Sequence, residues 1–153
     1  MKAGFNGARL HEKVFEDSFH YWADKLGYIT WAEWGNWGAN ENAKGTETAF
    51  MHEWPKIVEH LKNHPSIITW TPFNETNTLE CNAQHKKLMR IAYDVTKKID
   101  PTRPVNETSG YQHQKTDIWT VHNYEPIPEK LNKALNPKKG CLLYTSDAAD
   151  EAE

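Results

Sequence analysis

Short apolar runs alternate with longer segments of helical periodicity along most of this chain, and this alternation restricts the fold more than any other feature. Short runs rich in β-branched and aromatic residues are typical of strands. Apolar residues at every third or fourth position indicate helices with one buried face. Strands that alternate with helices form βαβ units, in which the strands run parallel. The sequence therefore predicts an α/β fold built on a parallel sheet.

Five segments are predicted as strands, namely residues 8–10, 28–32, 66–72, 105–106 and 117–121. A complete eight-stranded β/α barrel needs roughly 250 residues, whereas this chain has 153. We therefore expect a partial (β/α)8 TIM barrel, with about five of the eight parallel strands and the helices between them. We assign this partial barrel domain to residues 1–140. The remaining strands and helices of the barrel would be its missing partner.

Three helices are predicted between these strands, over residues 16–27, 50–61 and 85–99. Gly27 suits the left-handed residue that ends a helix. Pro55 is expected to kink or delay the second helix, because proline lacks the amide hydrogen. The apolar stripe of the first helix is expected to contain Phe15, Phe19, Trp22, Ala23 and Leu26. A lysine-rich stretch at 130–139 is interpreted as a solvated helix face.

The apolar run 66–72 ends in Phe73-Asn74-Glu75, which brings an amide and a carboxyl group to the end of a buried strand. In barrels of parallel strands, catalytic groups lie at the carboxyl ends of the strands. A glutamate there, with an amide beside it to hold a sugar hydroxyl, is typical of glycosidic-bond chemistry. The alternative is a polar residue that simply opens a loop.

Composition excludes several other classes of function. The net charge is −3, which gives no basic patch for nucleic acid. No stretch approaches the ~18 apolar residues of a membrane span, so we expect no membrane partner. His60 and His64 have the spacing of zinc ligands on a helix, but no third ligand or HExxH pattern accompanies them. We therefore predict no metal and no cofactor.

Several motifs together resemble glycoside hydrolase family 2, the group of β-galactosidases, β-glucuronidases and β-mannosidases. Gly4-Phe5-Asn6-Gly7-Ala8-Arg9-Leu10-His11 resembles the second barrel strand of that family, and residues 19–27 resemble the helix that follows. Residues 63–75 resemble the fourth strand, and Asp100-Pro101-Thr102-Arg103-Pro104-Val105 resembles the entry to the fifth. The resemblance extends to about Tyr124. It implies a barrel domain and a retaining hydrolase of O-glycosyl bonds, β-galactosidase-like in type, that acts on a carbohydrate β-glycoside.

The resemblance also implies roles for individual residues. Glu75 would be the general acid/base, with a pKa raised by burial or by a neighbouring carboxylate. Asn74 would hydrogen-bond the sugar 2-hydroxyl. The remaining candidates for substrate contact are Arg9, His11, Trp34, His122 and Tyr124. Arg9 would also set the charge state of the acid pair, and Tyr124 would lie near the nucleophile. The alternatives for Arg9 and His11 are a salt bridge and a surface histidine.

The nucleophile of the family lies on the seventh strand, which nothing after Tyr124 supplies. Glu33, Glu107 and Glu125 follow strand ends, but they are interpreted as ordinary loop acids. Two alternatives to a hydrolase fragment stay open. One is a catalytically inactive fragment that at most binds carbohydrate weakly, and the other is a related glucanase or mannanase barrel.

The two ends of the chain carry further expectations. Residues 141–153 match no part of the family and resemble the translation of a sequencing adapter, so we expect them not to be native structure. The chain opens on Gly4-Phe5-Asn6-Gly7 without a signal peptide, which suggests an internal start. The cellular location therefore stays unknown.

Overall fold

The computed structural model describes residues 3–76, 82–110 and 112–134. Strands and helices alternate through most of this range, as the sequence predicts. In chain order the elements are β1 (Gly7–Arg9), α1 (Asp17–Leu26), β2 (Ile29–Glu33), α2 (Lys44–Leu61), β3 (Ile67–Thr71), β4 (Phe73–Asn74), α3 (Ala83–Ile99), β5 (Thr108–Ser109) and α4 (Pro128–Ala134).

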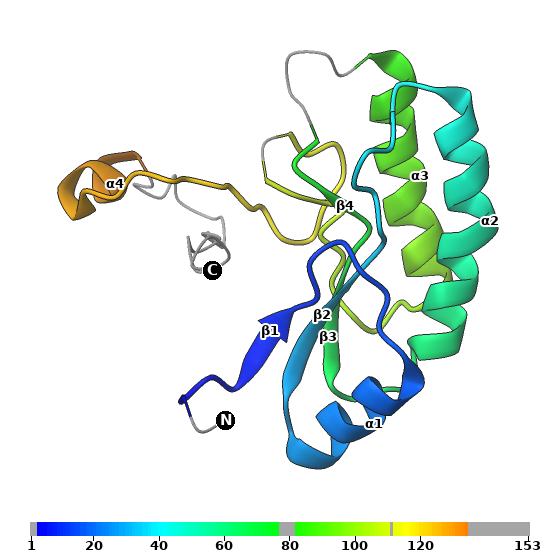
Figure 1. Ribbon diagram of the computed structural model, residues 1–153. Coiled ribbons are helices and arrows are strands. Elements are labelled where there is room, and N and C mark those ends of the chain that lie inside the picture. Colours follow the sequence, from blue (N-terminus) through cyan, green and yellow to red (C-terminus); the bar gives the residue numbers. More distant parts are fainter. Residues whose placement is uncertain (1–2, 77–81, 111, 135–153) are drawn as a thin grey trace.

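The strands form two small parallel sheets, and the continuous segment 67–74 contributes β3 to one and β4 to the other (Figure 1). The first sheet has the order β1-β2-β3, and the second pairs β4 with β5. The helices α1 and α2 connect the strands of the first sheet, which gives the expected βαβ units. A parallel bridge between Trp70 and Val105 joins β3 to the segment before β5. The described residues thus form part of a β/α barrel whose sheet is open.

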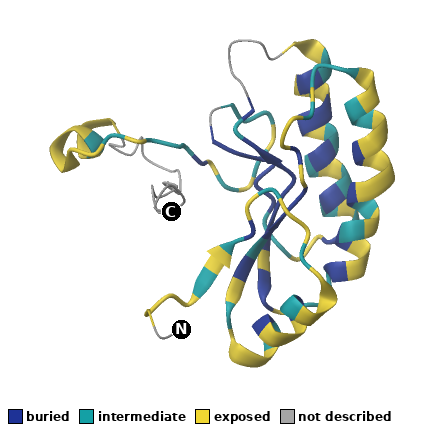
Figure 2. Cartoon of the chain, viewed as in Figure 1, coloured by how far each residue is buried: buried dark blue, intermediate teal, exposed yellow. Residues whose placement is uncertain are grey.

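Helices α2 and α3 lie side by side on one face of the strands, and the core fills the space between (Figures 1 and 2). Trp54 and Trp70 are fully buried there, with ring centroids 5.8 Å apart at an interplanar angle of 87°. The indole N–H of Trp54 donates to Thr96 Oγ1 at 2.7 Å, and that of Trp70 donates to Asp100 Oδ2 at 2.9 Å. Aromatic burial on this scale fixes the helices on the sheet.

Two predicted strands differ from the structure. Residues 117–121 form no strand, although Val121 takes part in an isolated bridge, and of 105–106 only Val105 does so. The predicted strand 66–72 corresponds to β3, which ends at Thr71; Pro72, which has no amide hydrogen for a ladder, separates it from β4. In the segment 112–120, side chains bind the backbone N–H groups of Gln114, Lys115 and Thr120, as described below, while the Asp117 N–H donates to the Val105 carbonyl at 2.8 Å.

The helices also depart from the predictions in detail. Pro55 lies inside α2, which begins at Lys44, so the predicted delay is wrong. Tertiary burial of Phe50, Trp54, Val58 and Leu61 stabilises α2 on both sides of the proline. Gly27 ends α1 with a φ of 66°, as expected.

Helix α1 buries less than its sequence predicts. Trp22 and Leu26 are 58% and 56% exposed, and the buried positions are His20 and Ala23. Helix α4 lies apart from the sheet and has no buried residue (Figures 1 and 2). Its lysines are solvated as predicted, while residues 135–139 lie outside the described range.

The segment assigned to an adapter, residues 141–153, also lies outside the described residues, so its boundary stays a prediction. Among the residues that the structure describes, no helix is long and apolar enough to cross a membrane.

Candidate active site

Glu75 follows β4 directly, at the carboxyl end of the strand segment that runs through the core. Its backbone N–H donates to the Ser109 carbonyl at 2.8 Å, which continues the pairing of β4 with β5. Glu75 has a φ of 44°, in the left-handed region that residues other than glycine rarely adopt. Such backbone geometry is concentrated at functional sites, where the surrounding structure enforces it.

Two aromatic side chains bind the Glu75 carboxyl group. Tyr124 donates from its hydroxyl to Glu75 Oε1 at 2.7 Å, and His122 Nδ1 contacts the same oxygen. The His122 ring is 2% exposed, and its Nε2 lies 2.9 Å from Ser109 Oγ. Gly110 leaves the space for this ring, because a Cβ atom there would lie 2.9 Å from it. The structure therefore brings Glu75, His122 and Tyr124 together.

These contacts change the expected titration of Glu75. Burial raises the pKa of the Glu75 carboxyl, but hydrogen bonds from His122 and Tyr124, together with the charges of His122 and Arg9, lower it further than burial raises it. The net direction is below the ordinary value, so the expectation of a raised pKa is wrong for the described residues. The physical reason is that both partners are donors, and donors stabilise the ionised carboxylate.

Arg9 lies between Glu33 and Asn74. Its Nε contacts Glu33 Oε1, and its Nη2 donates to Glu33 Oε2 at 3.3 Å and to Asn74 Oδ1 at 2.5 Å. Its charge lowers the pKa of Glu75, which agrees with part of the predicted role. Its direct hydrogen bonds, however, hold a buried carboxylate and the Asn74 amide.

Asn74 is 6% exposed, and a second asparagine fixes its backbone. The Asn36 side chain accepts the Asn74 N–H at 3.2 Å and donates to the Asn74 carbonyl at 3.3 Å. This side-chain amide thus pairs with Asn74 as a neighbouring strand would. Asn36 was missed by sequence reasoning, and its place in a Gly/Asn-rich loop gave no signal.

The other two predicted contact residues lie in different surroundings. The His11 side chain is 44% exposed, with Nε2 4.0 Å from Glu12 Oε2. Trp34 is 6% exposed and belongs to the hydrophobic core, where its ring packs edge-on against Phe50 and Phe73. Trp34 therefore has the position of a core residue, and the structure does not bring it together with Glu75.

Two glutamates interpreted as ordinary loop acids are fully buried, so that interpretation is wrong for them. Glu33 is 1% exposed and, besides Arg9, accepts the backbone N–H of Glu12 at 2.8 Å. Burial raises the pKa of Glu33, and Arg9 opposes that rise. Glu107 is also fully buried, in a separate network. A signal existed for Glu33, since an arginine at the end of the adjacent strand needs an anion.

His60 and His64, which have the spacing of zinc ligands, each contact a different aspartate. His60 Nε2 lies 2.7 Å from Asp17 Oδ1, and His64 Nδ1 lies 2.6 Å from Asp24 Oδ2. Across the described ranges, no group of three or more His, Cys, Asp or Glu side chains could hold a metal ion.

Comparison with known proteins agrees with this arrangement. The family model described as glycosyl hydrolases family 2, TIM barrel domain, matches residues 18–142. The chain belongs to glycosyl hydrolases family 2. Its matched segment lies in the TIM barrel domain of that family, which agrees with the parallel strands and the helices between them.

Relatives in family 2 are much longer than this chain. A β-galactosidase from Psychromonas ingrahamii is 42% identical over 88 residues, which cover 57% of this chain and 7% of that protein. A β-glucuronidase from Parabacteroides merdae superposes with a TM-score of 0.73 at 18% identity, covering 86% of this chain and 18% of that one. β-Glucuronidase 3 from Bacteroides uniformis superposes with a TM-score of 0.65 at 22% identity, covering 76% and 16%.

Proposed function

We propose that this chain supplies the acid/base part of the active site of a retaining β-glycosidase, β-galactosidase-like in type, with Glu75 as the general acid/base. The observation that carries the proposal is the Glu75 carboxyl group at a strand end, bound by His122 and Tyr124. Family membership supports the reaction class, and the β-galactosidase relative supports the substrate class of β-galactosides.

In this mechanism Glu75 first donates a proton to the leaving glycosidic oxygen and later removes a proton from the attacking water. The donors His122 and Tyr124 favour the ionised carboxylate, which is the form that Glu75 reaches after the first step. The first step needs the protonated form. A second carboxylate, about 5–5.5 Å away in retaining enzymes, raises the pKa of the acid by like-charge repulsion.

Asn74 is proposed to hold the sugar 2-hydroxyl, with its amide oriented by Arg9. A hydrogen bond to this hydroxyl strengthens in the transition state, so its orientation contributes to rate. His11, which is partly exposed beside Glu12, is proposed as a further contact for the sugar.

A second candidate is an inactive fragment that binds sugar weakly. The lowered pKa of Glu75 favours this candidate for the chain on its own, because a general acid must hold its proton near the working pH. Turnover of nitrophenyl β-galactoside by the purified 153-residue chain separates the two. Turnover that Glu75→Gln abolishes would eliminate the inactive-fragment candidate, while turnover that survives this substitution would eliminate Glu75 as the acid/base.

Binding gives a readout that does not require turnover. In an NMR titration with nitrophenyl β-galactoside, we expect shifts at the Asn74 amide, Glu75 and Tyr124. The exposed Glu129→Gln variant on α4 is the matched control and should bind as the unaltered chain does. A titration that leaves these three residues unchanged would contradict the proposed site.

A further inference from the structure

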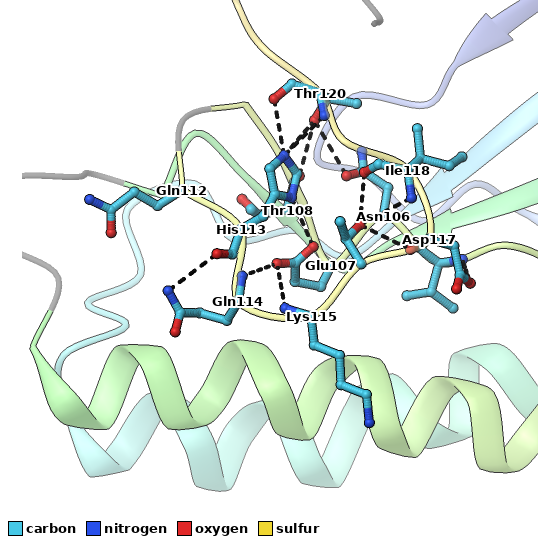
Figure 3. A network of polar contacts seen from close by, with 12 residues as sticks. Asn106, Glu107, Thr108, Gln112, His113, Gln114, Lys115, Asp117, Ile118 and Thr120 are labelled. Carbon is cyan, nitrogen blue, oxygen red and sulfur yellow. Dashed lines mark hydrogen bonds and ion pairs between the residues drawn. The ribbon is translucent and has the colours of Figure 1, made fainter. Parts of the chain in front are cut away.

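Glu107 is a fully buried carboxylate that the proposed chemistry does not use. It lies directly before β5, and its Oε1 accepts the backbone N–H groups of Gln114 and Lys115, the latter at 3.2 Å (Figure 3). Its Oε2 lies 3.0 Å from His113 Nδ1. A buried carboxylate is costly unless it is hydrogen-bonded, and these three contacts satisfy it. Glu107 therefore fastens the turn at 113–115 to the start of β5.

His113 lies between Glu107 and Thr120 and contacts both. Its side chain is 1% exposed, and its ring packs on Trp119 with centroids 4.8 Å apart. A neutral imidazole that donates from Nδ1 to Glu107 accepts at Nε2. His113 Nε2 lies 3.0 Å from both the backbone nitrogen and the carbonyl oxygen of Thr120, and 3.3 Å from its Oγ1; with the ring proton on Nδ1 it accepts the Thr120 N–H (Figure 3). A carboxylate that binds one ring nitrogen thus fixes which nitrogen is free to bind the backbone.

Thr120 in turn lies two residues before His122. Its Oγ1 accepts the Gly110 N–H at 2.9 Å. Gly110 is the residue whose missing side chain leaves room for the His122 ring. Ser109, next to Gly110, contacts His122 Nε2 through its hydroxyl. The segment that carries His122 is therefore tied to β5 from both sides, through Thr120 and through the ring itself.

We propose that Glu107 and His113 are positioning residues that hold His122 against Glu75. They act through Thr120, and their hydrogen bonds go to the turn at 113–115 and to Thr120. The catalytic meaning of this positioning rests on the proposed function of Glu75, whereas the coupling itself does not.

The test follows the titration of Glu75 by carboxyl ¹³C NMR in the 153-residue chain. The unaltered protein should titrate below the ordinary glutamate value, because His122 and Tyr124 bind the ionised form. In Glu107→Gln, the new amide donor faces His113 Nδ1, so the ring accepts there and carries its proton on Nε2. That N–H then faces the Thr120 carbonyl oxygen, 3.0 Å away, and the nitrogen no longer accepts the Thr120 N–H, so the contact that orients Thr120 changes. The pKa of Glu75 should then rise toward its ordinary value. Exchange of the Thr120 amide should become roughly tenfold faster, as expected for one lost hydrogen bond.

A second variant keeps the test decisive if Glu107→Gln fails to fold. His113→Phe keeps a ring against Trp119 and removes the link to Thr120, so it should raise the pKa of Glu75 in the same direction. Tyr124→Phe removes a direct hydrogen bond to Glu75, so its change in the pKa of Glu75 is the reference with which the two network variants are compared. Glu59→Gln, on the exposed side of α2, is the matched control and should leave the titration unchanged.

Two results would overturn the proposal. One is that both network variants lose stability while Glu75 titrates as in the unaltered chain, which would make the network purely structural. The other is an unaltered chain in which Glu75 titrates at its ordinary value. Failure of the proposed function is distinguishable, since it would leave the coupling of Glu107 to Glu75 intact while β-galactoside shifts neither Asn74 nor Tyr124.

Discussion

Replacing Arg9 with methionine should destabilise the fold strongly through Glu33. The two side chains are 11% and 1% exposed, so the guanidinium is the counter-ion of a nearly fully buried carboxylate. Removing one member of a buried ion pair typically costs about 3–5 kcal/mol. Glu33 keeps one donor, the Glu12 N–H at 2.8 Å, so we expect the lower end of this range. A loss of about 3 kcal/mol is a large part of the roughly 5–15 kcal/mol that stabilises a domain.

Urea unfolding followed by tryptophan fluorescence, at protein concentrations low enough to prevent association, measures this loss. The deficit of Arg9→Met should shrink between pH 7 and pH 5. Burial already raises the pKa of Glu33, and without Arg9 it rises further, so the folded state binds a proton that the unfolded state does not. Stability of the variant therefore falls as the pH rises.

The double variant with Glu33→Gln should recover more than half of the deficit, because a neutral amide needs no counter-ion. Arg90→Met is the matched control, since Arg90 is exposed and its Nη2 donates to Gln114 Oε1 at 3.2 Å; it should change stability by less than about 0.5 kcal/mol. An Arg9→Met deficit below about 1 kcal/mol, or one that Glu33→Gln leaves unchanged, would refute the counter-ion argument.

Three further predictions concern other parts of the chain. His20 is fully buried, and burial lowers its pKa, so the folded state binds fewer protons than the unfolded state and the urea midpoint should fall as the pH drops below about 6.5. Thr96→Val leaves the indole N–H of Trp54 unpaired in the core and should cost about 1–3 kcal/mol in the free energy of unfolding. Gly110→Ala adds a Cβ atom 2.9 Å from the His122 ring at a φ of 85°, so it should lower the thermal midpoint and raise the pKa of the carboxyl group that this ring binds.

Each of these has its own control. His20→Phe should flatten the pH dependence between pH 7 and pH 5, and an equal slope in both proteins would contradict the role of His20. Thr96→Ser keeps the acceptor and loses only a buried methyl group, so it should be more stable than the valine variant; a serine variant as unstable as the valine variant would rule out the hydrogen bond as the cause. Gly4→Ala has a φ of 88° but no atom within 4 Å of its Cβ, so it isolates backbone strain from contact with the ring.

The fold was largely predictable because its main elements bury regular apolar faces. The runs 28–32 and 66–72 and the periodic segments 50–61 and 85–99 lie close to β2, β3, α2 and α3. Such patterns result from burial on one side, which sequence periodicity records. The prediction of a strand at 117–121 was wrong because side-chain contacts, which periodicity does not record, replace regular pairing there. The buried side chains of Glu107 and His113 accept the backbone N–H groups of Gln114 and Thr120.

The proximity of Glu75, His122 and Tyr124 was predictable from the sequence, but the electrostatics of the candidate site was less so. Glu75 and Asn74 were found from their place at a strand end, and His122 and Tyr124 from the resemblance to the family. The direction of the Glu75 pKa shift depends on which donors reach the carboxyl group, and sequence spacing carries no such information. The burial of Glu107 likewise depends on a turn that is formed only by distant contacts.

The amide of Asn36 has a practical consequence for redesign of this domain. Because it pairs with both backbone groups of Asn74, it anchors the loop after β2 to the candidate site. Residues 37–40, which include the 83% exposed Trp37, lie between this anchor and Glu41, whose carboxylate accepts from the Asn36 amide. Within this stretch Gly38 has a φ of 77° and the Asn40 side chain accepts the Asn42 N–H at 3.1 Å, so the positions free to vary are Trp37 and Ala39. Libraries that vary them while keeping both ends should alter what the loop presents to solvent and leave the backbone geometry of Asn74 unchanged.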